Sequence, residues 1–204
     1  MTDSPAIKKG RKFDQVLDAA CEVFLSEGFE RTSMDEIAAR AGVSKATVYS
    51  YFPDKRLLFM EAAKTEISRR AMDAESGIPE GAPVAMVLAF SARILVDFSL
   101  SDFGKNLFRI CVANAETFPE LGQMLHETGP KLAITRLSEY FAEATERGEL
   151  AVDNPDLAAA QFVELCKADV FARVILGVDT QVTEEEITSV VKGAVDMFLA
   201  RYGV

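Results

Sequence analysis

The chain has 204 residues, 49% of them hydrophobic, so it is long enough to bury a sizeable core as one large domain or two small ones. Strand-forming runs are sparse and Ala, Leu, Glu and Met are plentiful, which favours an all-α fold and excludes a strand-rich one. The net charge of −10 is uneven, because residues 1–56 hold nine Lys/Arg and nine Asp/Glu and the whole deficit lies in residues 57–204. The acidic total therefore does not exclude nucleic-acid binding by the N-terminal part.

Cysteine content and hydropathy indicate in which cellular compartment the protein resides. Cys21, Cys111 and Cys166 are odd in number and widely spaced, which indicates free thiols in a reducing environment. The N-terminus lacks the apolar region of a signal peptide, and the longest nearly uncharged run, residues 81–92, is too short to span a membrane. We expect a cytoplasmic protein without a membrane partner.

Residues 1–10 are predicted to form an arm, followed by a helix over residues 12–27. Four basic residues, Lys8, Lys9, Arg11 and Lys12, lie at their junction. They either contact DNA phosphates or the minor groove, or they form a solvated tail that leads into the helix. An apolar face at helical spacing marks the helix itself, with Phe13, Val16, Leu17, Ala20 and Phe24, and Gly28 ends it.

The stretch from Thr32 to Arg56 has the pattern of a helix-turn-helix. Ser33 is a good N-cap with Glu36 three residues later, and a short helix over residues 34–41 follows. Gly42 then stands where a chain leaving a helix often needs a positive φ. Ser44 caps the second helix, whose inner side is formed by Val48 and Phe52. This spacing fits two helices joined by a tight turn.

The second helix of such a motif lies in the major groove of DNA and reads base edges with its outward side chains. Lysine pairs with phosphate or guanine, and hydroxyl groups bond to bases or phosphates. Lys55, in the first turn of the next helix, is expected to clamp a phosphate. The predicted DNA-binding residues are Lys9, Arg11, Ser33, Ser44, Lys45, Thr47, Tyr49, Ser50, Tyr51 and Lys55. The alternative is an amphipathic helical hairpin that packs and binds nothing.

These residues carry a family resemblance. The matching positions are Gly28-Phe29, Thr32 to Ile37, Ala41 to Ser44, Thr47 to Tyr49, and Tyr51-Phe52 through Lys55 and Leu58. This pattern resembles the DNA-binding domain of the TetR/AcrR transcriptional regulators. The resemblance implies a ligand-responsive repressor that binds a palindromic operator as a homodimer and is released by a small molecule. It implies a DNA-binding domain over residues 1–56 and a ligand-binding and dimerisation domain over residues 57–204.

The remainder of the chain has only helical patterns. A helix over residues 54–75 precedes a loop at residues 77–83, and further helices are expected from Pro83, Asp102 and Phe118. Gly129-Pro130 breaks the pattern, and helices over residues 130–147, 155–176 and 183–202 follow, the last one opened by a capping box. The prediction is an all-α chain of about nine helices, with a three-helix helix-turn-helix domain and a C-terminal antiparallel helical bundle.

The last two predicted helices are apolar enough to need burial on more than one side. Either a second copy of the chain covers them, or they close the core of a monomer. In the family that the chain resembles, the last two helices form a dimeric four-helix bundle. The segment from Phe118 to Leu150 and the helix start at Asn154-Pro155 look similar to the AefR-like subgroup. The resemblance implies a dimer interface with Phe171, Val174, Ile187, Val191, Ala194, Val195 and Phe198.

A small-molecule pocket is likewise implied by the resemblance. Candidate lining residues are polar or aromatic side chains within apolar helical runs: Phe90, Arg93, Asp97, Phe98, Phe108, Arg109, Phe162, Cys166 and Asp169. Core packing or a solvated face is the alternative for each. The chain has one histidine, His126, and no GxGxxG, P-loop or CxxC motif, so we expect no catalytic residues, metal or cofactor. Two other interpretations remain: an effector-free or architectural DNA-binding protein, and a helical interaction adaptor.

Overall fold

A computed structural model describes residues 10–75, 79, 81–178 and 181–204. These residues form eleven α-helices and no strand, apart from an isolated antiparallel bridge between Leu150 and Gly203, so the all-α prediction is confirmed. Two compact units divide at Ser68 and Arg69, later than the expected boundary at residues 56 and 57. Within the described ranges no single helix is long and apolar enough to cross a membrane. Two consecutive helices, Val84–Leu100 and Asp102–Ala113, reach that length and hydropathy only when taken together, and they are bent by 64°.

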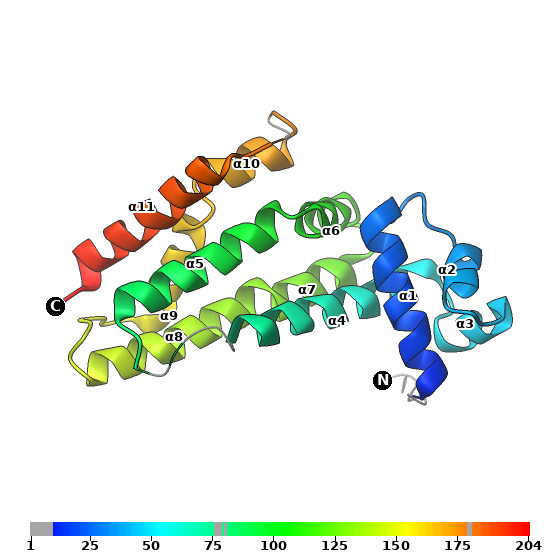
Figure 1. Cartoon of the computed structure of the whole chain (residues 1–204), viewed down its shortest axis with the longest axis horizontal. Helices are drawn as coiled ribbons and strands as arrows, with labels where there is room; N and C mark the ends of the chain where they lie inside the picture. The colour runs from blue at the N-terminus through cyan, green and yellow to red at the C-terminus, as the bar shows by residue number, and fades with distance from the viewer. Residues whose placement is uncertain (1–9, 76–78, 80, 179–180) are drawn as a thin grey trace. The chain divides into compact units, whose positions relative to one another are not determined.

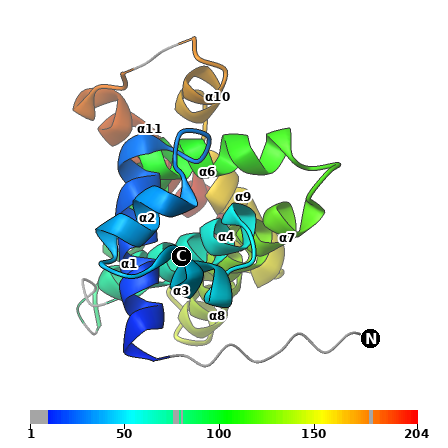
Figure 2. The ribbon, with the colours of Figure 1, turned by 90° about the vertical axis from the view of Figure 1, so that its right-hand side faces the viewer.

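The first unit contains α1 (Arg11–Glu27), α2 (Met34–Arg40), α3 (Lys45–Tyr51) and the first part of α4 (Lys55–Glu75). Figure 2 labels these four helices. Its buried core includes Val16, Ile37, Val48, Phe52 and Leu58. The start of α4 belongs to this unit because its apolar side chains pack there. The ring of Phe59, for example, lies 5.1 Å from that of Phe24 and 5.0 Å from that of Phe29.

The second unit contains α5 (Val84–Leu100), α6 (Asp102–Ala113), α7 (Pro119–Thr128), α8 (Pro130–Glu146), α9 (Pro155–Leu165), α10 (Val170–Ile175) and α11 (Glu184–Tyr202). Side chains of α5, α8, α9 and α11 form its core, and α5 and α11 lie side by side in Figure 1. The ring centroid of Phe198 lies 4.6 Å from that of Phe141 and 5.3 Å from that of Phe162. Three distant segments of the chain therefore meet in one aromatic cluster.

Local signals set most helix starts in this unit. Asn154 caps α9, with its side-chain oxygen 3.1 Å from the backbone nitrogen of Leu157. Thr183 and Glu186 form the predicted capping box at the start of α11. Gly129-Pro130 separates α7 from α8, as the sequence indicates.

One predicted helix is two helices in the structure. The segment expected to be helical from residue 155 to 176 is broken between α9 and α10 by the turn Cys166–Asp169. The apolar side chains of the two helices pack against different neighbours: α9 lies mainly against α8, and α10 lies against α5, α6 and α11. The chain changes direction between them (Figure 1).

Candidate nucleic-acid interface and ligand pocket

The turn between α2 and α3 has the geometry that the sequence predicts. The Ser33 side chain accepts a hydrogen bond from the Glu36 backbone N–H at 3.2 Å, and Ser44 does the same for Thr47 at 3.1 Å. Between the two helices Gly42 has a φ of 64°, which favours glycine. Val48 is fully buried and fixes the rotation of α3 about its axis. The opposite side of α3 is therefore directed to solvent.

Lys45 and Tyr49 are the prominent side chains on that outward side. The Tyr49 ring is 43% exposed, and the Lys45 ammonium lies 5.9 Å from its centroid. The same ammonium lies 2.7 Å from a carboxylate oxygen of Asp35, and this hydrogen-bonded pair raises the pKa of Lys45. Because both partners are more than half exposed, their ion pair contributes little to stability.

The other hydroxyl groups predicted to contact DNA are engaged within the motif. Ser33 and Ser44 serve as N-caps, and the Thr47 and Ser44 hydroxyl oxygens lie 2.9 Å apart. The Ser50 hydroxyl donates to the Thr47 carbonyl oxygen at 2.7 Å. Tyr51 is half-buried, with its ring edge-on to a core phenylalanine of α1. These residues hold the shape of the motif, whereas Lys45 and Tyr49 project from it.

Lys55 has a structural role that the sequence did not predict. Its ammonium donates to the carbonyl oxygens of Phe29 at 2.8 Å, Thr32 at 3.1 Å and Glu30 at 3.3 Å, and lies 4.4 Å from the Phe29 ring centroid. Three acceptors match the three donors of an ammonium group, so the expected phosphate clamp has no donor to spare.

Two further DNA-contact predictions concern the N-terminal arm. Arg11 is exposed in the first turn of α1. Lys9 lies outside the described residues. The arm therefore stays a prediction, and the structure supports α3 as the reading element.

The apolar residues predicted to line a ligand pocket are spread over the second unit. Phe162 and Cys166 are fully buried in the core, where burial raises the pKa of the Cys166 thiol to about 12. Phe98 packs edge-on against Phe103, and Phe108 packs edge-on against Phe171 at 5.2 Å. Phe90 is half-buried on α5. These five side chains are not gathered around one described cavity.

The polar candidates join helices to one another. Arg93 on α5 forms ion pairs with Asp97 and with Glu184 at the start of α11, and hydrogen bonds to Glu184 and then Asp97 raise its pKa. Arg109 on α6 donates to the carbonyl oxygens of Val174 and Ile175, at 2.8 and 3.1 Å, and so caps the end of α10. Asp169 lies 3.0 Å from the Arg173 guanidinium.

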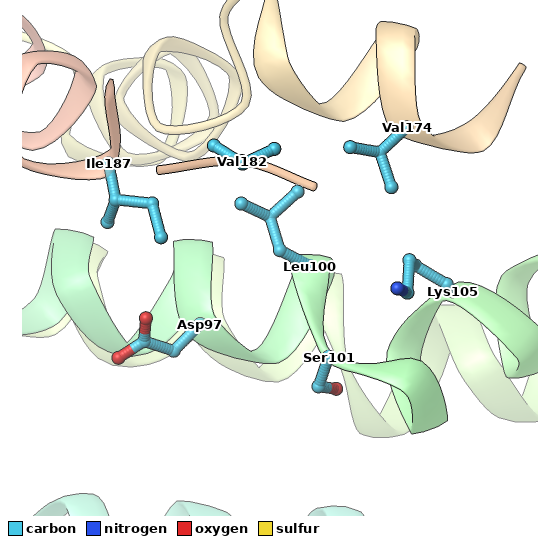
Figure 3. A pocket seen from close by; sticks show the side chains of 7 residues that line it. All are labelled: Asp97, Leu100, Ser101, Lys105, Val174, Val182 and Ile187. Carbon is cyan, nitrogen blue, oxygen red and sulfur yellow. The ribbon is translucent and has the colours of Figure 1, made fainter. Parts of the chain in front are cut away.

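A pocket of about 240 Å³ does exist in the second unit. It is lined by Asp97, Leu100, Ser101, Lys105, Val174, Val182 and Ile187. Figure 3 shows Leu100 facing Val182 and Val174, with the Lys105 ammonium at one edge. That ammonium lies 2.8 Å from Asp102, which is largely exposed. Of the predicted ligand residues only Asp97 lines this pocket, because its walls come from chain segments that the sequence does not show to be neighbours.

The predicted dimer residues lie mostly inside one protomer. Val174, Ala194, Val195 and Phe198 are buried, Phe171 packs on Phe108, Ile187 lines the pocket, and Val191 packs against the core. The apolar stripe of α11 therefore packs against its own protomer, and the predicted dimer interface stays a prediction. Exposed apolar side chains in this region include Leu157 on α9, at 53%, Met197 on α11, at 62%, and Leu176 at the C-cap of α10, at 77%.

Both units match one family of known proteins. Residues 16–62 match the bacterial regulatory proteins of the tetR family, and residues 86–204 match the C-terminal domain of AefR-like transcriptional repressors. A solved TetR-family transcriptional regulator from Mesorhizobium loti is 30% identical, with a TM-score of 0.85, and 95% of this chain and 98% of that chain are covered. The flavonoid-responsive regulator FrrA is 33% identical, with a TM-score of 0.70 and coverage of 96% and 98%.

Similarity to curated sequences is more local. The fatty acid metabolism regulator protein of Bacillus subtilis is 32% identical over 82 residues, which are 40% of this chain and 42% of that relative. This chain thus matches less than half of that relative's length. The two family profiles, however, cover residues 16–62 and 86–204, and the match to the Mesorhizobium loti structure covers 95% of the chain. With the helix-turn-helix geometry of α2 and α3, they show that the chain belongs to the TetR family of DNA-binding transcriptional regulators.

Proposed function

We propose that this regulator is a dimeric repressor that binds a near-palindromic DNA operator and is released by a small molecule. The observation that carries the proposal is α3, which is capped by Ser44 and presents Lys45 and Tyr49 to solvent from a helix-turn-helix. The profile matched by the second unit is that of transcriptional repressors, and FrrA is named as responsive to flavonoids. The protein would then act by binding in the cytoplasm and not by catalysis.

The dimer is proposed to form through the exposed sides of α9 and α11, here called the α9–α11 face. This face contains Leu157, Gln161, Met197 and Tyr202. The Tyr202 hydroxyl lies 3.1 Å from the Gln161 side-chain oxygen, and this contact brings the exposed sides of the two helices together. A twofold axis through the face would pair the same patch on both protomers. Two copies of α3 about 34–36 Å apart would then read successive turns of DNA.

The effector is proposed to occupy the pocket lined by Asp97 and Lys105. Its volume of about 240 Å³ is below the roughly 300–1,000 Å³ of sites for drug-sized ligands, which favours a small molecule. Leu100, Val174 and Val182 offer an apolar wall, so the ligand would have an apolar body. Asp97 and Lys105 would orient its polar ends.

The test is binding of the purified protein to the DNA upstream of its own gene at several salt concentrations. We expect a footprint over a palindrome and a steep loss of affinity with salt. Lys45→Ala and Tyr49→Ala should each weaken binding at least tenfold, and Lys45→Ala should lower the salt slope by about one phosphate contact. Lys131→Ala, which removes an exposed lysine of α8, is the matched control. Wild-type affinity in both α3 variants would contradict the proposal.

A further inference from the structure

The turn between α9 and α10 occurs where the sequence favours a continuous helix. Residues 166–169 are Cys, Lys, Ala and Asp, with neither glycine nor proline among them. Apolar residues continue at helical spacing on both sides, from Phe162 to Val174. Local sequence therefore does not require the break.

The backbone at the turn is strained. Asp169 has a φ of 63° and a ψ of −63°, and it is the non-glycine residue with positive φ in the described ranges. The Val170 N–H donates to the Ala168 carbonyl oxygen at 2.8 Å. These values define the γ-turn with positive φ at its centre, a rare conformation that is unfavourable for any residue with a Cβ atom.

Contacts of α10 hold the bent arrangement against this strain. Arg109 on α6 caps the last carbonyl groups of α10, and Phe108 packs edge-on against Phe171. Arg173 lies 2.8 Å from Glu186 on α11. The ion pair of Arg173 with Asp169, by contrast, joins residues four apart and is compatible with a straight helix as well. The contacts with α6 and α11 thus select the bend.

The bend also builds the ligand pocket. Val174 on α10 faces Leu100 and Lys105 across the pocket, so a change in the direction of α10 removes one wall (Figure 3). On the other side of the turn, α9 carries Leu157 and Gln161 of the α9–α11 face. The turn therefore connects the element that forms the pocket to the element proposed to contact the second protomer.

We propose that Cys166–Asp169 is a strained two-state hinge. In one state α10 is bent away and the pocket is formed; in the other, α9 and α10 join into one helix from Pro155 to Ile175 and the pocket is open. A ligand that fills the pocket binds the bent state and shifts the equilibrium towards it. The role of the hinge in regulation rests on the proposed function, whereas the existence of the two states does not.

Substitutions at Asp169 separate strain from charge. Asp169→Gly relieves the strain and keeps the bend, so the thermal midpoint should rise although the ion pair with the half-buried Arg173 is lost. Asp169→Glu keeps the charge next to Arg173 but favours a regular helix. Ala172→Gly, at an exposed position within α10, is the matched control and should lower the midpoint, as glycine does in a helix.

The two states differ in a distance that spin labels measure. Labels at Asp156→Cys and Leu176→Cys, in a Cys21→Ser background and diluted into unlabelled protein, report on one protomer. Twenty residues of straight helix span about 30 Å, and the bent state gives a shorter distance. Asp169→Gly should give the short distance alone, and Asp169→Glu should add a population near 30 Å.

The same distance distribution in both variants, or a fall in the thermal midpoint of Asp169→Gly like that of Ala172→Gly, would overturn the proposal. Neither measurement involves DNA. Failure of the hinge is therefore distinguishable from failure of the repressor.

Discussion

Replacing Lys55 by Met removes the ammonium group that joins the start of α4 to the segment between α1 and α2. Three carbonyl oxygens, those of Phe29, Glu30 and Thr32, lose their donor, and the methionine side chain keeps most of the apolar contact. A hydrogen bond to a charged group contributes about 1.5–3 kcal/mol. One of the three is long at 3.3 Å and Lys55 is half-exposed, so we expect a total loss of about 2 kcal/mol.

That loss is measurable in the first unit. For a unit of this size, about 2 kcal/mol corresponds to a fall of about 10 °C in the thermal midpoint. The assay is thermal unfolding followed by circular dichroism, together with operator binding at a temperature where the variant is folded. Lys45→Met is the matched control. The exposed ion pair of Lys45 with Asp35 contributes little to stability, so the thermal midpoint of this variant should equal that of the wild type, and its operator affinity should fall.

The opposite pattern would refute the reasoning. If Lys55→Met unfolds at the wild-type temperature and loses operator affinity, its ammonium serves a DNA phosphate and the carbonyl contacts carry little free energy. Lys55→Arg adds a second check, because a guanidinium keeps the charge but has a different donor geometry. It should recover only part of the stability.

Three further predictions concern the second unit. Met197→Asp should raise the dimer dissociation constant measured by sedimentation at least tenfold, since a charge would be buried at the α9–α11 face. Thr135→Asp on α8 should leave that constant unchanged. The same dissociation constant for both variants would contradict the proposed face. Hydrogen bonds from the N-cap backbone, and then from Arg173, lower the pKa of Glu186 to about 2, below its ordinary value of 4.5, so its stabilising effect is present above pH 4.5 and is lost as the pH falls towards 2. The free energy of unfolding of Glu186→Gln, measured with urea, should therefore depend less on pH across that range. If wild type and variant show the same pH dependence, Glu186 does not have this stabilising role. Gly104→Ala should destabilise the protein strongly, because a Cβ atom there would collide with a backbone carbonyl oxygen of α5. A Cβ atom at Gly122 would contact no other atom, so Gly122→Ala should stabilise α7. The same change of thermal midpoint in both variants would contradict this packing.

The helix-turn-helix could be predicted because its signals are local. Ser33, Gly42 and Ser44 each act within three or four residues, through an N-cap or a positive φ, and the buried Val48 fixes the outward side of α3. The structural role of Lys55 could not be predicted in the same way. Its acceptors lie 23 to 26 residues earlier, and nothing in the sequence shows that the chain returns to them.

The pocket and the dimer face depend on packing between distant segments. The periodicity of α11 shows that Ala194 and Phe198 are buried, but it does not show whether this protomer or another covers them. The break at Asp169 was missed because helix propensity and apolar spacing both continue through it. The contacts with α6 and α11 that favour the bend exist only once the unit is folded.

The last helix has a consequence for how this regulator assembles. Ala194, Val195 and Phe198 fill the core of their own protomer, so this part of α11 is covered without a second copy. In the proposed dimer, folding and association would then be separate steps, and a subunit would stay folded below the dissociation constant of the dimer. Below that dissociation constant, operator occupancy by the proposed dimer would rise with the square of the protomer concentration. A modest change in expression would then produce a larger change in the proposed repression.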